Sequence, residues 1–484
     1  MRDMVLVLSF DNDFARIIAR KLRSEHVYCK VTPGDIDLAE VQRQNPAGLV
    51  LVGGVVARGR QGPGGMDVRM LDMGLPLLAL GSAARTLCEA MGGERGEGTI
   101  EKKAATVTYA PIPLFAGIET GERWLEHAHD LRLPEGLVPA AEAEGITVGF
   151  AHTQKPLFGL QFQIENNDPD GLTMLSNFVL GVCGCTTWWS TEAFVERAKE
   201  DIHHLSEGQG ALCSVSGGLD STVCALLAHQ ALGERLHCVL VDTGLMRRDE
   251  ARRTQQDLQA LGLRVTLADR RAETLQALAG CGRIGAKQQA VRGVLTQTLQ
   301  AEALALGGCH MLLRGTNYTD IMLREEPGPP QEDSCGSMRI LEPLRDLFRD
   351  EVYRAGELLA VPPQILHRQP FPFTGLAARV WGEVSASQLD LLREADDIFA
   401  QEIEQAGQER KLWKYYAALA PMPGEGDTYQ VLLRAVYKKD VGTAPARIAY
   451  DLLERTVERI LAQPGIARVL YDITPSAHGD VGWK

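Results

Sequence analysis

The residues best suited to chemistry lie at Ser216–Thr222, which reads Ser-Gly-Gly-Leu-Asp-Ser-Thr. An apolar run at 211–215 precedes this segment and a helical pattern follows it, so we predict a loop between a strand and a helix. Such a loop offers free backbone N–H groups and the positive end of a helix dipole, which suits a polyphosphate. Gly217 and Gly218 allow close approach of the backbone, and Asp220 can hold a magnesium ion. We therefore interpret the segment as a nucleotide-binding loop.

Two further strands are predicted to bring loops to the same place. Residues 237–241 form an apolar run that ends at Asp242, and residues 311–313 form another that ends in the polar segment 314–320. Strands that alternate with helices form a parallel sheet, and ligands bind at the C-terminal ends of its strands. The predicted nucleotide site comprises Ser216, Gly217, Gly218, Leu219, Asp220, Ser221, Thr222, Val241, Asp242, Gly315, Thr316 and Asp320.

The loop lacks the lysine of the Walker pattern, which argues against a P-loop NTPase. Its Ser-Gly-Gly-x-Asp-Ser sequence resembles instead the pyrophosphate loop (PP-loop) of the ATP pyrophosphatases, which cleave ATP between the α and β phosphates. Asp-Thr-Gly-Leu follows at 242–245, and Gly-Thr-Asn-Tyr-Thr-Asp follows at 315–320. In this order the three segments resemble those of the GMP synthase family.

This resemblance extends over nearly the whole chain and implies three domains. Residues 1–188 resemble a class I glutamine amidotransferase domain, and residues 189–367 resemble an ATP pyrophosphatase domain with a parallel sheet, of the adenine nucleotide α-hydrolase type. Residues 368–484 resemble the family's C-terminal dimerisation and substrate domain, which is smaller and α+β. The implied fold class is therefore α/β.

The first domain lacks the groups that hydrolyse glutamine in the family. That reaction needs a thiolate on a sharp strand-to-helix turn, oriented by a histidine and an acid. Gly81 occupies the nucleophile position and Gln163 the position of the base, while only the acid Glu165 matches. An amide cannot accept a proton at neutral pH. Ser82 lies one residue past the turn and Cys88 lies within the following helical pattern, so we expect no glutaminase activity.

The substrate-binding positions that the resemblance implies also differ. The family's last segment holds the nucleotide through Lys, Thr and Glu, and Ser476, Asp480 and Gly482 occupy these positions here. A carboxylate near a phosphate is repulsive, and the loss of the lysine removes a compensating charge. We therefore predict poor binding of xanthosine monophosphate. The predicted substrate pocket comprises Arg368, Phe373, Thr374, Gly375, Ser476 and Asp480.

Cations in the second domain could face the pyrophosphate. Lys287 matches a family lid lysine, and Arg345 and Arg349 stand where the family has lysines. From the resemblance we predict that Asp220, Lys287 and Arg349 are catalytic and that Asp220 is a magnesium ligand. The acidic segment 325–336, rich in Pro and Gly, is predicted to be a loop.

The composition is that of an intracellular enzyme with two or three domains. The chain has 484 residues, and a hydrophobic content of 45% is ample for their cores. The formal net charge of −13 argues against nonspecific binding to nucleic acid or anionic membranes. No apolar run approaches the ~18 residues of a membrane span, and the ten cysteines form no C-x-x-C pair. We expect a cytoplasmic protein with free thiols and, from the resemblance, a homodimer.

The resemblance implies a ligase that uses ATP and Mg²⁺. A substrate carbonyl oxygen would attack the α phosphorus, pyrophosphate would leave, and a nucleophile would then displace AMP. We predict a small purine-like substrate and free ammonia as the nucleophile. The alternatives are an ammonia-dependent GMP synthase acting on xanthosine monophosphate, a sulfur-transfer enzyme with Cys335 as its carrier, and a non-catalytic nucleotide-binding protein.

Overall fold

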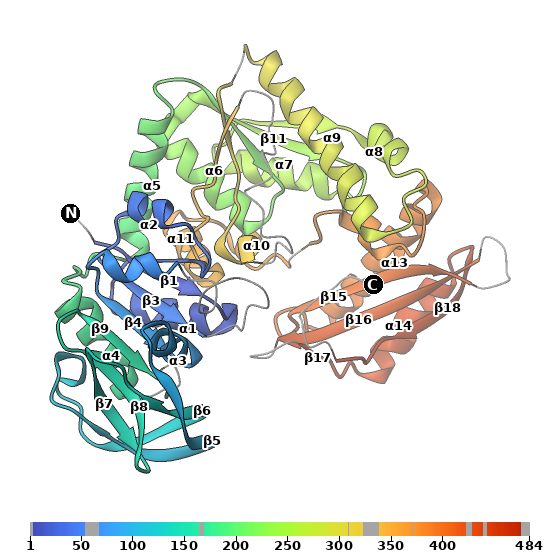
Figure 1. Cartoon of the computed structure of the whole chain (residues 1–484). Helices are drawn as coiled ribbons and strands as arrows, with labels where there is room; N and C mark the ends of the chain where they lie inside the picture. Colours follow the sequence, from blue (N-terminus) through green and yellow to red (C-terminus); the bar gives the residue numbers. More distant parts are fainter. Residues whose placement is uncertain are drawn as a thin grey trace. The chain divides into compact units, whose positions relative to one another are not determined.

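The computed structural model describes residues 3–53, 67–162, 164, 169–307, 309–322, 338–369, 371–422, 428–438 and 443–475. The chain forms two compact units, Met1–Phe194 and Val195–Lys484 (Figure 1). Both contain helices and strands, and the predicted α/β fold class is confirmed. The predicted boundaries after residues 188 and 367 remain predictions. Among the described helices, none combines the length and the apolar composition that a membrane span requires.

The first unit is built on a nine-stranded sheet with the strand order β2-β1-β3-β4-β9-β8-β7-β5-β6. Its parallel half consists of β1 (Val5–Ser9), β2 (Cys29–Pro33), β3 (Gly48–Val52), β4 (Leu77–Leu80) and β9 (Leu157–Leu160). All residues of β1, β3, β4 and β9 are buried, as expected for parallel strands covered on both faces. The apolar run at residues 5–8 therefore forms a central strand.

The other half of this sheet is antiparallel. It consists of β5 (Glu94–Tyr109), β6 (Gly121–Arg132), β7 (Leu137–Ala143) and β8 (Ile146–His152), and the long strands β5 and β6 form its outer edge (Figure 1). The helices of the unit are α1 (Asn12–Ser24), α2 (Leu38–Gln44), α3 (Ser82–Ala90), α4 (Pro169–Ser176) and a π-helix (Asn177–Val182). Short 3-10 helices lie at Val68–Asp72 and Pro113–Phe115.

The second unit contains a five-stranded parallel sheet with the order β12-β11-β10-β13-β14. Its strands are β10 (Ala211–Val215), β11 (Leu236–Asp242), β12 (Val265–Asp269), β13 (Met311–Leu313) and β14 (Arg339–Leu341). The chain moves outward from β10 to β12 and then returns to the other side of β10. The strand order therefore reverses between β10 and β13, which is where ligands bind in open α/β sheets.

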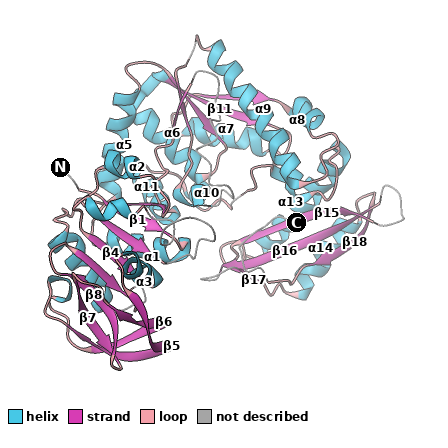
Figure 2. Ribbon diagram, in the orientation of Figure 1, coloured by secondary structure: helices cyan, strands magenta, loops and turns pink. Residues whose placement is uncertain are grey.

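Helices surround this sheet (Figure 2). They are α5 (Thr191–Leu205), α6 (Leu219–Leu232), α7 (Glu250–Ala260), α8 (Arg271–Ala277), α9 (Ile284–Ala305), α10 (Tyr318–Met322), α11 (Arg349–Leu358) and α12 (Pro363–Leu366), with a 3-10 turn at Gly233–Arg235. Leu299 and Ala303 of α9 share a core cluster with Leu212 and Val239 of the sheet. Helix α6 is buried almost all round, from Val223 to Ala228, so the loop before it is tied to the core.

The C-terminal part of the second unit has a sheet of its own. Strands β15 (Lys414–Pro421), β16 (Tyr429–Lys438) and β17 (Thr443–Pro445) are antiparallel, and β18 (Ile466–Tyr471) pairs in parallel with β16. A 3-10 helix, η5 (Gly375–Arg379), and helices α13 (Ala386–Gln405) and α14 (Tyr450–Leu461) complete this part. Its core cluster also contains Leu245, Leu278 and Val291 from the preceding part of the unit. Residues from both parts of the second unit therefore pack together in this cluster.

Candidate nucleotide-binding site

The predicted nucleotide loop lies between β10 and α6, as the sequence indicates. The backbone N–H of Ser216 donates to Ser221 Oγ at 3.1 Å, and the two serine hydroxyls are 3.2 Å apart. Thr222 Oγ1 donates to the carbonyl of Gly218 at 2.9 Å, which folds the loop onto the first turn of the helix. No side chain caps the N–H groups of that turn. This helix end can therefore accept an anion.

The loop after β13 packs directly on this helix end. A Cβ on Gly315 would lie 2.7 Å from the backbone carbonyl oxygen of Asp220, so only glycine fits there. Asn317, which is buried, donates through Nδ2 to Asp220 Oδ1 at 3.0 Å. Because β10 and β13 are neighbours at the reversal of strand order, two of the three predicted loops meet at the expected ligand-binding edge.

Asn317 links two carboxylates at this edge, those of Asp220 and Asp320. Asn317 binds Asp220 through its side chain, and its backbone N–H donates to Asp320 Oδ2 at 3.0 Å. Among the described residues, no group of three or more His, Cys, Asp or Glu side chains could hold a metal ion by itself. Mg²⁺ in nucleotide sites is usually held by one or two carboxylates together with phosphate oxygens. Asp220 and Asp320 therefore fit a magnesium ion that arrives with a polyphosphate.

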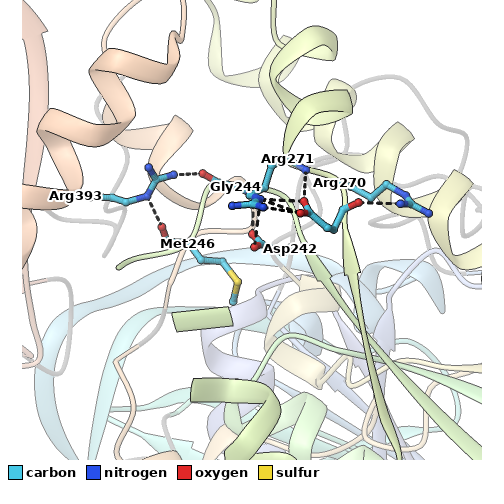
Figure 3. A network of polar contacts seen from close by, with 7 residues as sticks. Asp242, Gly244, Met246, Arg270, Arg271 and Arg393 are labelled. Atoms are coloured by element: carbon cyan, nitrogen blue, oxygen red, sulfur yellow. Dashed lines mark hydrogen bonds and ion pairs between the residues drawn. The ribbon is translucent and has the colours of Figure 1, made fainter. Parts of the chain in front are cut away.

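The third predicted loop follows β11 and is stabilised by charged side chains (Figure 3). Asp242 Oδ1 accepts a hydrogen bond from the N–H of Gly244 at 2.9 Å, and Oδ2 lies 3.9 Å from Arg271 Nε. Arg271 also donates to Asp269, and this hydrogen bonding lowers the pKa of Asp269 to about 2. Val241 is buried at the end of the strand. The predicted contact of Val241 and Asp242 with ATP remains a prediction.

Arg368 contacts the nucleotide loop itself. Its Nη1 donates to the carbonyl of Gly217 at 2.8 Å and to Thr254 Oγ1 at 3.1 Å, and its Nη2 pairs with Asp257 at 3.1 Å. Gly217 has a φ of +79°, and a Cβ there would overlap Thr254. The sequence predicts Arg368 as part of the substrate pocket, whereas its observed hydrogen bonds go to the predicted nucleotide loop and to α7. Thr254 and Asp257 were missed, although their spacing of three residues places them on one helix face.

Lys287 is buried and makes its bonds to the C-terminal part of the unit. Its Nζ donates to the carbonyls of Ala377 at 3.0 Å and Val380 at 2.7 Å. Burial lowers the pKa of this amine to about 8. These two bonds would have to break before the ammonium could reach a phosphate, so its predicted catalytic role gains no support from the observed contacts.

Two of the remaining predicted residues of this site, Thr316 and Arg345, lie beside Glu342. Thr316 Oγ1 donates to Glu342 Oε1 at 2.7 Å, and Arg345 Nη1 lies 3.9 Å from the same carboxylate group. Arg349 is exposed at the first position of α11, and Leu219 is buried at the first position of α6. The catalytic role of Arg349 remains a prediction.

The predicted substrate-pocket residues of the 372–376 segment have different environments. Phe373 is 54% exposed, with the Arg292 guanidinium 5.6 Å from its ring centroid. Thr374 is buried, and a Cβ on Gly375 would lie 2.3 Å from the carbonyl oxygen of Leu245. Thr374 and Gly375 are therefore packing positions beside the loop after β11, whereas Phe373 is free to meet a ligand.

The first unit contains the turn on which the family's nucleophile would stand. Gly81 links β4 to α3 with φ +65° and ψ −133°, and its N–H donates to the carbonyl of Leu160 at 2.8 Å. This backbone conformation costs little only for glycine, and it is the strained kind found at nucleophile elbows. A Cβ at Gly81 would meet only the Phe14 ring, at 3.4 Å. Cys88 is buried within α3, and burial raises its pKa to about 11, which disfavours a thiolate.

Several predicted residues lie outside the described part of the chain. These are Gln163 and Glu165 of the amidotransferase-like unit, Cys335 with the segment 325–336, and Ser476, Asp480 and Gly482 near the C-terminus. Their assigned roles stay predictions from the sequence.

Comparison with known proteins agrees with the two-unit arrangement. Residues 6–182 match the class-I glutamine amidotransferase family, and residues 401–483 match the GMP synthase C-terminal domain family. Proteins named GMP synthase (glutamine-hydrolyzing) are similar along the full chain. That of Heliobacterium modesticaldum is 34% identical, covering 100% of this chain and 99% of its own length. That of Aquifex aeolicus is 33% identical, covering 100% of both chains. That of Thermomicrobium roseum is 34% identical, covering 100% of this chain and 97% of its own length. With such identity over its entire length, the chain belongs to the GMP synthase family.

Proposed function

We propose that this chain is an ATP-dependent ligase that replaces a carbonyl oxygen of a purine or purine-like substrate with an amino group. Free ammonia is the nitrogen donor, and glutamine is not hydrolysed. Membership of the GMP synthase family supports the ATP-dependent amination. The observation that carries the ammonia dependence is Gly81, which has the backbone of a nucleophile elbow and no side chain to act as the nucleophile.

The proposed reaction has two steps. The substrate carbonyl oxygen attacks the α phosphorus of ATP, the bond to the bridging oxygen of the β phosphate breaks, and pyrophosphate leaves. Ammonia then adds to the activated carbon, gives up a proton, and AMP departs with the former carbonyl oxygen. N–H groups at the start of α6 and the Ser216 hydroxyl would donate to phosphate oxygens where negative charge develops. Asp220 and Asp320 would hold Mg²⁺, which supplies further charge stabilisation when bound.

Product analysis tests this proposal. The full chain is incubated with ATP, Mg²⁺ and a panel of purine bases, nucleosides and nucleotides, with either ammonium or glutamine as the nitrogen source. We expect AMP, pyrophosphate and an aminated product with ammonium, and no product with glutamine. Release of ADP and phosphate, or of glutamate from glutamine, would overturn the assignment. A thiolated product in a parallel incubation with sulfide, without an aminated product from ammonium, would favour the sulfur-transfer alternative.

The named relatives make xanthosine monophosphate the first substrate to test. We propose that it reacts poorly, because Ser476 and Asp480 replace a cation and a hydroxyl that would face its phosphate. The loss of one charge-assisted hydrogen bond typically costs about 1.5–3 kcal/mol. Ser476→Lys with Asp480→Thr should lower the KM for xanthosine monophosphate at least tenfold. Ordinary ligase rates with the unmodified protein would identify it as an ammonia-dependent GMP synthase.

We also propose a homodimer with two-fold symmetry, which rests on the match to the GMP synthase C-terminal domain family. Light scattering at micromolar concentration should give twice the chain mass. A monomer under these conditions would contradict the proposal.

A further inference from the structure

The loop after β11 is held by a segment more than a hundred residues away in the sequence. Three consecutive carbonyls of this loop accept hydrogen bonds from residues 376–393. Arg393 donates through Nη2 to Gly244 O and through Nε to Met246 O at 3.1 Å (Figure 3). Between them, the N–H of Leu376 donates to Leu245 O at 2.8 Å. The carbonyls of residues 244–246 therefore all bind donors from the C-terminal part.

The turn is linked to the end of β11 by its own hydrogen bonding. Gly244 has a φ of +73°, and a Cβ there would lie 3.1 Å from the Arg271 side chain. Asp242, at the C-terminal end of β11, has one carboxylate oxygen bound to the N–H of Gly244. A change in the turn would therefore move Asp242 directly, at the sheet edge where the proposed ATP site lies.

Arg393 is well suited to hold the turn. It lies on α13, whose residues Leu389, Leu392 and Ala395 are buried in the core cluster of the C-terminal part. Its Nη1 binds Asp390 on the same helix at 2.6 Å, which restricts the side chain. A guanidinium presents several donors in one plane, so a single Arg can bind carbonyls two residues apart. One turn further along α13, Asp396 binds Arg247 Nε at 2.9 Å, which fixes the far end of the turn.

From these contacts we propose that Arg393 is a positioning residue for ATP. It holds the 242–247 turn from the C-terminal part of the unit and sets the affinity for ATP without touching the nucleotide. This inference rests on the proposed ATP-dependent function, but its structural step can be tested separately.

Hydrogen exchange of the full chain without ligands tests the structural step. Arg393→Met removes both bonds and keeps an apolar side chain in place. The amides of residues 244–247 should exchange at least tenfold faster than in the unmodified protein, and Arg393→Lys, which can make one bond, should lie between the two. Arg455→Met is the matched control, because Arg455 joins α14 to Glu402 of α13 at 3.1 Å. Unchanged exchange in Arg393→Met, or equal acceleration in Arg455→Met, would overturn the positioning role.

Kinetics with ATP test the functional step. Arg393→Met should raise the KM for ATP at least tenfold and change kcat less than threefold, while Arg455→Met should change neither. A fall in kcat with an unchanged KM would overturn the inference, because it would place Arg393 in the chemical step. If the unmodified protein forms no AMP from ATP, the proposed function is wrong, and so is the proposed effect of Arg393 on the KM for ATP. The exchange experiment still decides whether Arg393 holds the turn.

Discussion

The turns at Gly81 and Ser216 both lie between a strand and a helix, and they differ in length and in chemical content. Each follows a buried parallel strand and opens a helix whose first turn has no side-chain cap. The turn at Ser216 carries hydroxyl groups and a carboxylate that is bonded to Asn317. The turn between β4 and α3 is Gly81 alone, which has no side chain. The strand and the helix thus define where the turn lies. Its reactivity depends on the side chains that the turn carries.

The largest expected effect would show that the turn at Gly81 lacks only reactive side chains. We predict that the unmodified protein releases no glutamate from glutamine, and that Gly81→Cys with Gln163→His gives measurable hydrolysis. The reason is that the elbow backbone is present and a Cβ has room beside Phe14. A coupled glutamate assay measures the reaction, and Gly81→Cys alone, which lacks the base, is the control. Hydrolysis by the unmodified protein would remove the contrast between the turns.

The second prediction tests the side chains of the other turn. Asp220→Asn should lower pyrophosphate release from ATP at least tenfold, because it removes a proposed magnesium ligand, and about 1.4 kcal/mol of lost transition-state stabilisation has that effect. Ser216→Ala should act in the same direction through a lost phosphate contact. Asp451→Asn, on the exposed face of α14, is the control for the loss of one charge. Equal rates in all four proteins would show that this turn is also without a catalytic role.

The smallest expected effect concerns the pH dependence of stability. Lys287 has a pKa of about 8 in the folded protein and an ordinary value of 10.5. Between these values the unfolded chain binds more protons than the folded chain, so stability rises with pH. From pH 8 to pH 9 this group should contribute about 1 kcal/mol, because one pKa unit corresponds to about 1.36 kcal/mol.

Urea unfolding of the full chain checks this contribution. The stability of the unmodified protein relative to Lys287→Met should increase from pH 8 to pH 9. Lys411→Met removes the same charge from an exposed position and is the control. A constant difference between the two proteins across this range would contradict the lowered pKa and leave Lys287 free to act as a charged group.

The order of strands and loops in the second unit could be predicted because it is local in the sequence. The apolar run at 211–215 forms β10, and the polar segment after residues 311–313 packs on the nucleotide loop. Gly81 is similarly identified by the strand before it and the helix after it. In each case a few neighbouring residues determine the local conformation.

The contacts that hold these loops could not be predicted from spacing. Arg393 and the carbonyls that it binds are 147 and 149 residues apart, and Asn317 is 97 residues from Asp220. Arg368 and Lys287 show the same limitation, since both bind backbone carbonyls of distant segments. Every residue has a backbone carbonyl, so the sequence does not indicate which carbonyl accepts a given hydrogen bond. Only the folded chain identifies the partner.

The backbone conformation at Gly81 also sets a cost for any side chain at this position. With φ +65° and ψ −133°, any side chain at this position carries a strain of about 1–3 kcal/mol, which glycine avoids. A protein with glycine at this position is therefore more stable than one with cysteine. Gly81→Cys alone would introduce this strain without a base at position 163, so the single substitution should lower stability and give no hydrolysis. Under the proposed ammonia dependence, the backbone of this turn therefore favours glycine over a nucleophile on grounds of folding stability alone.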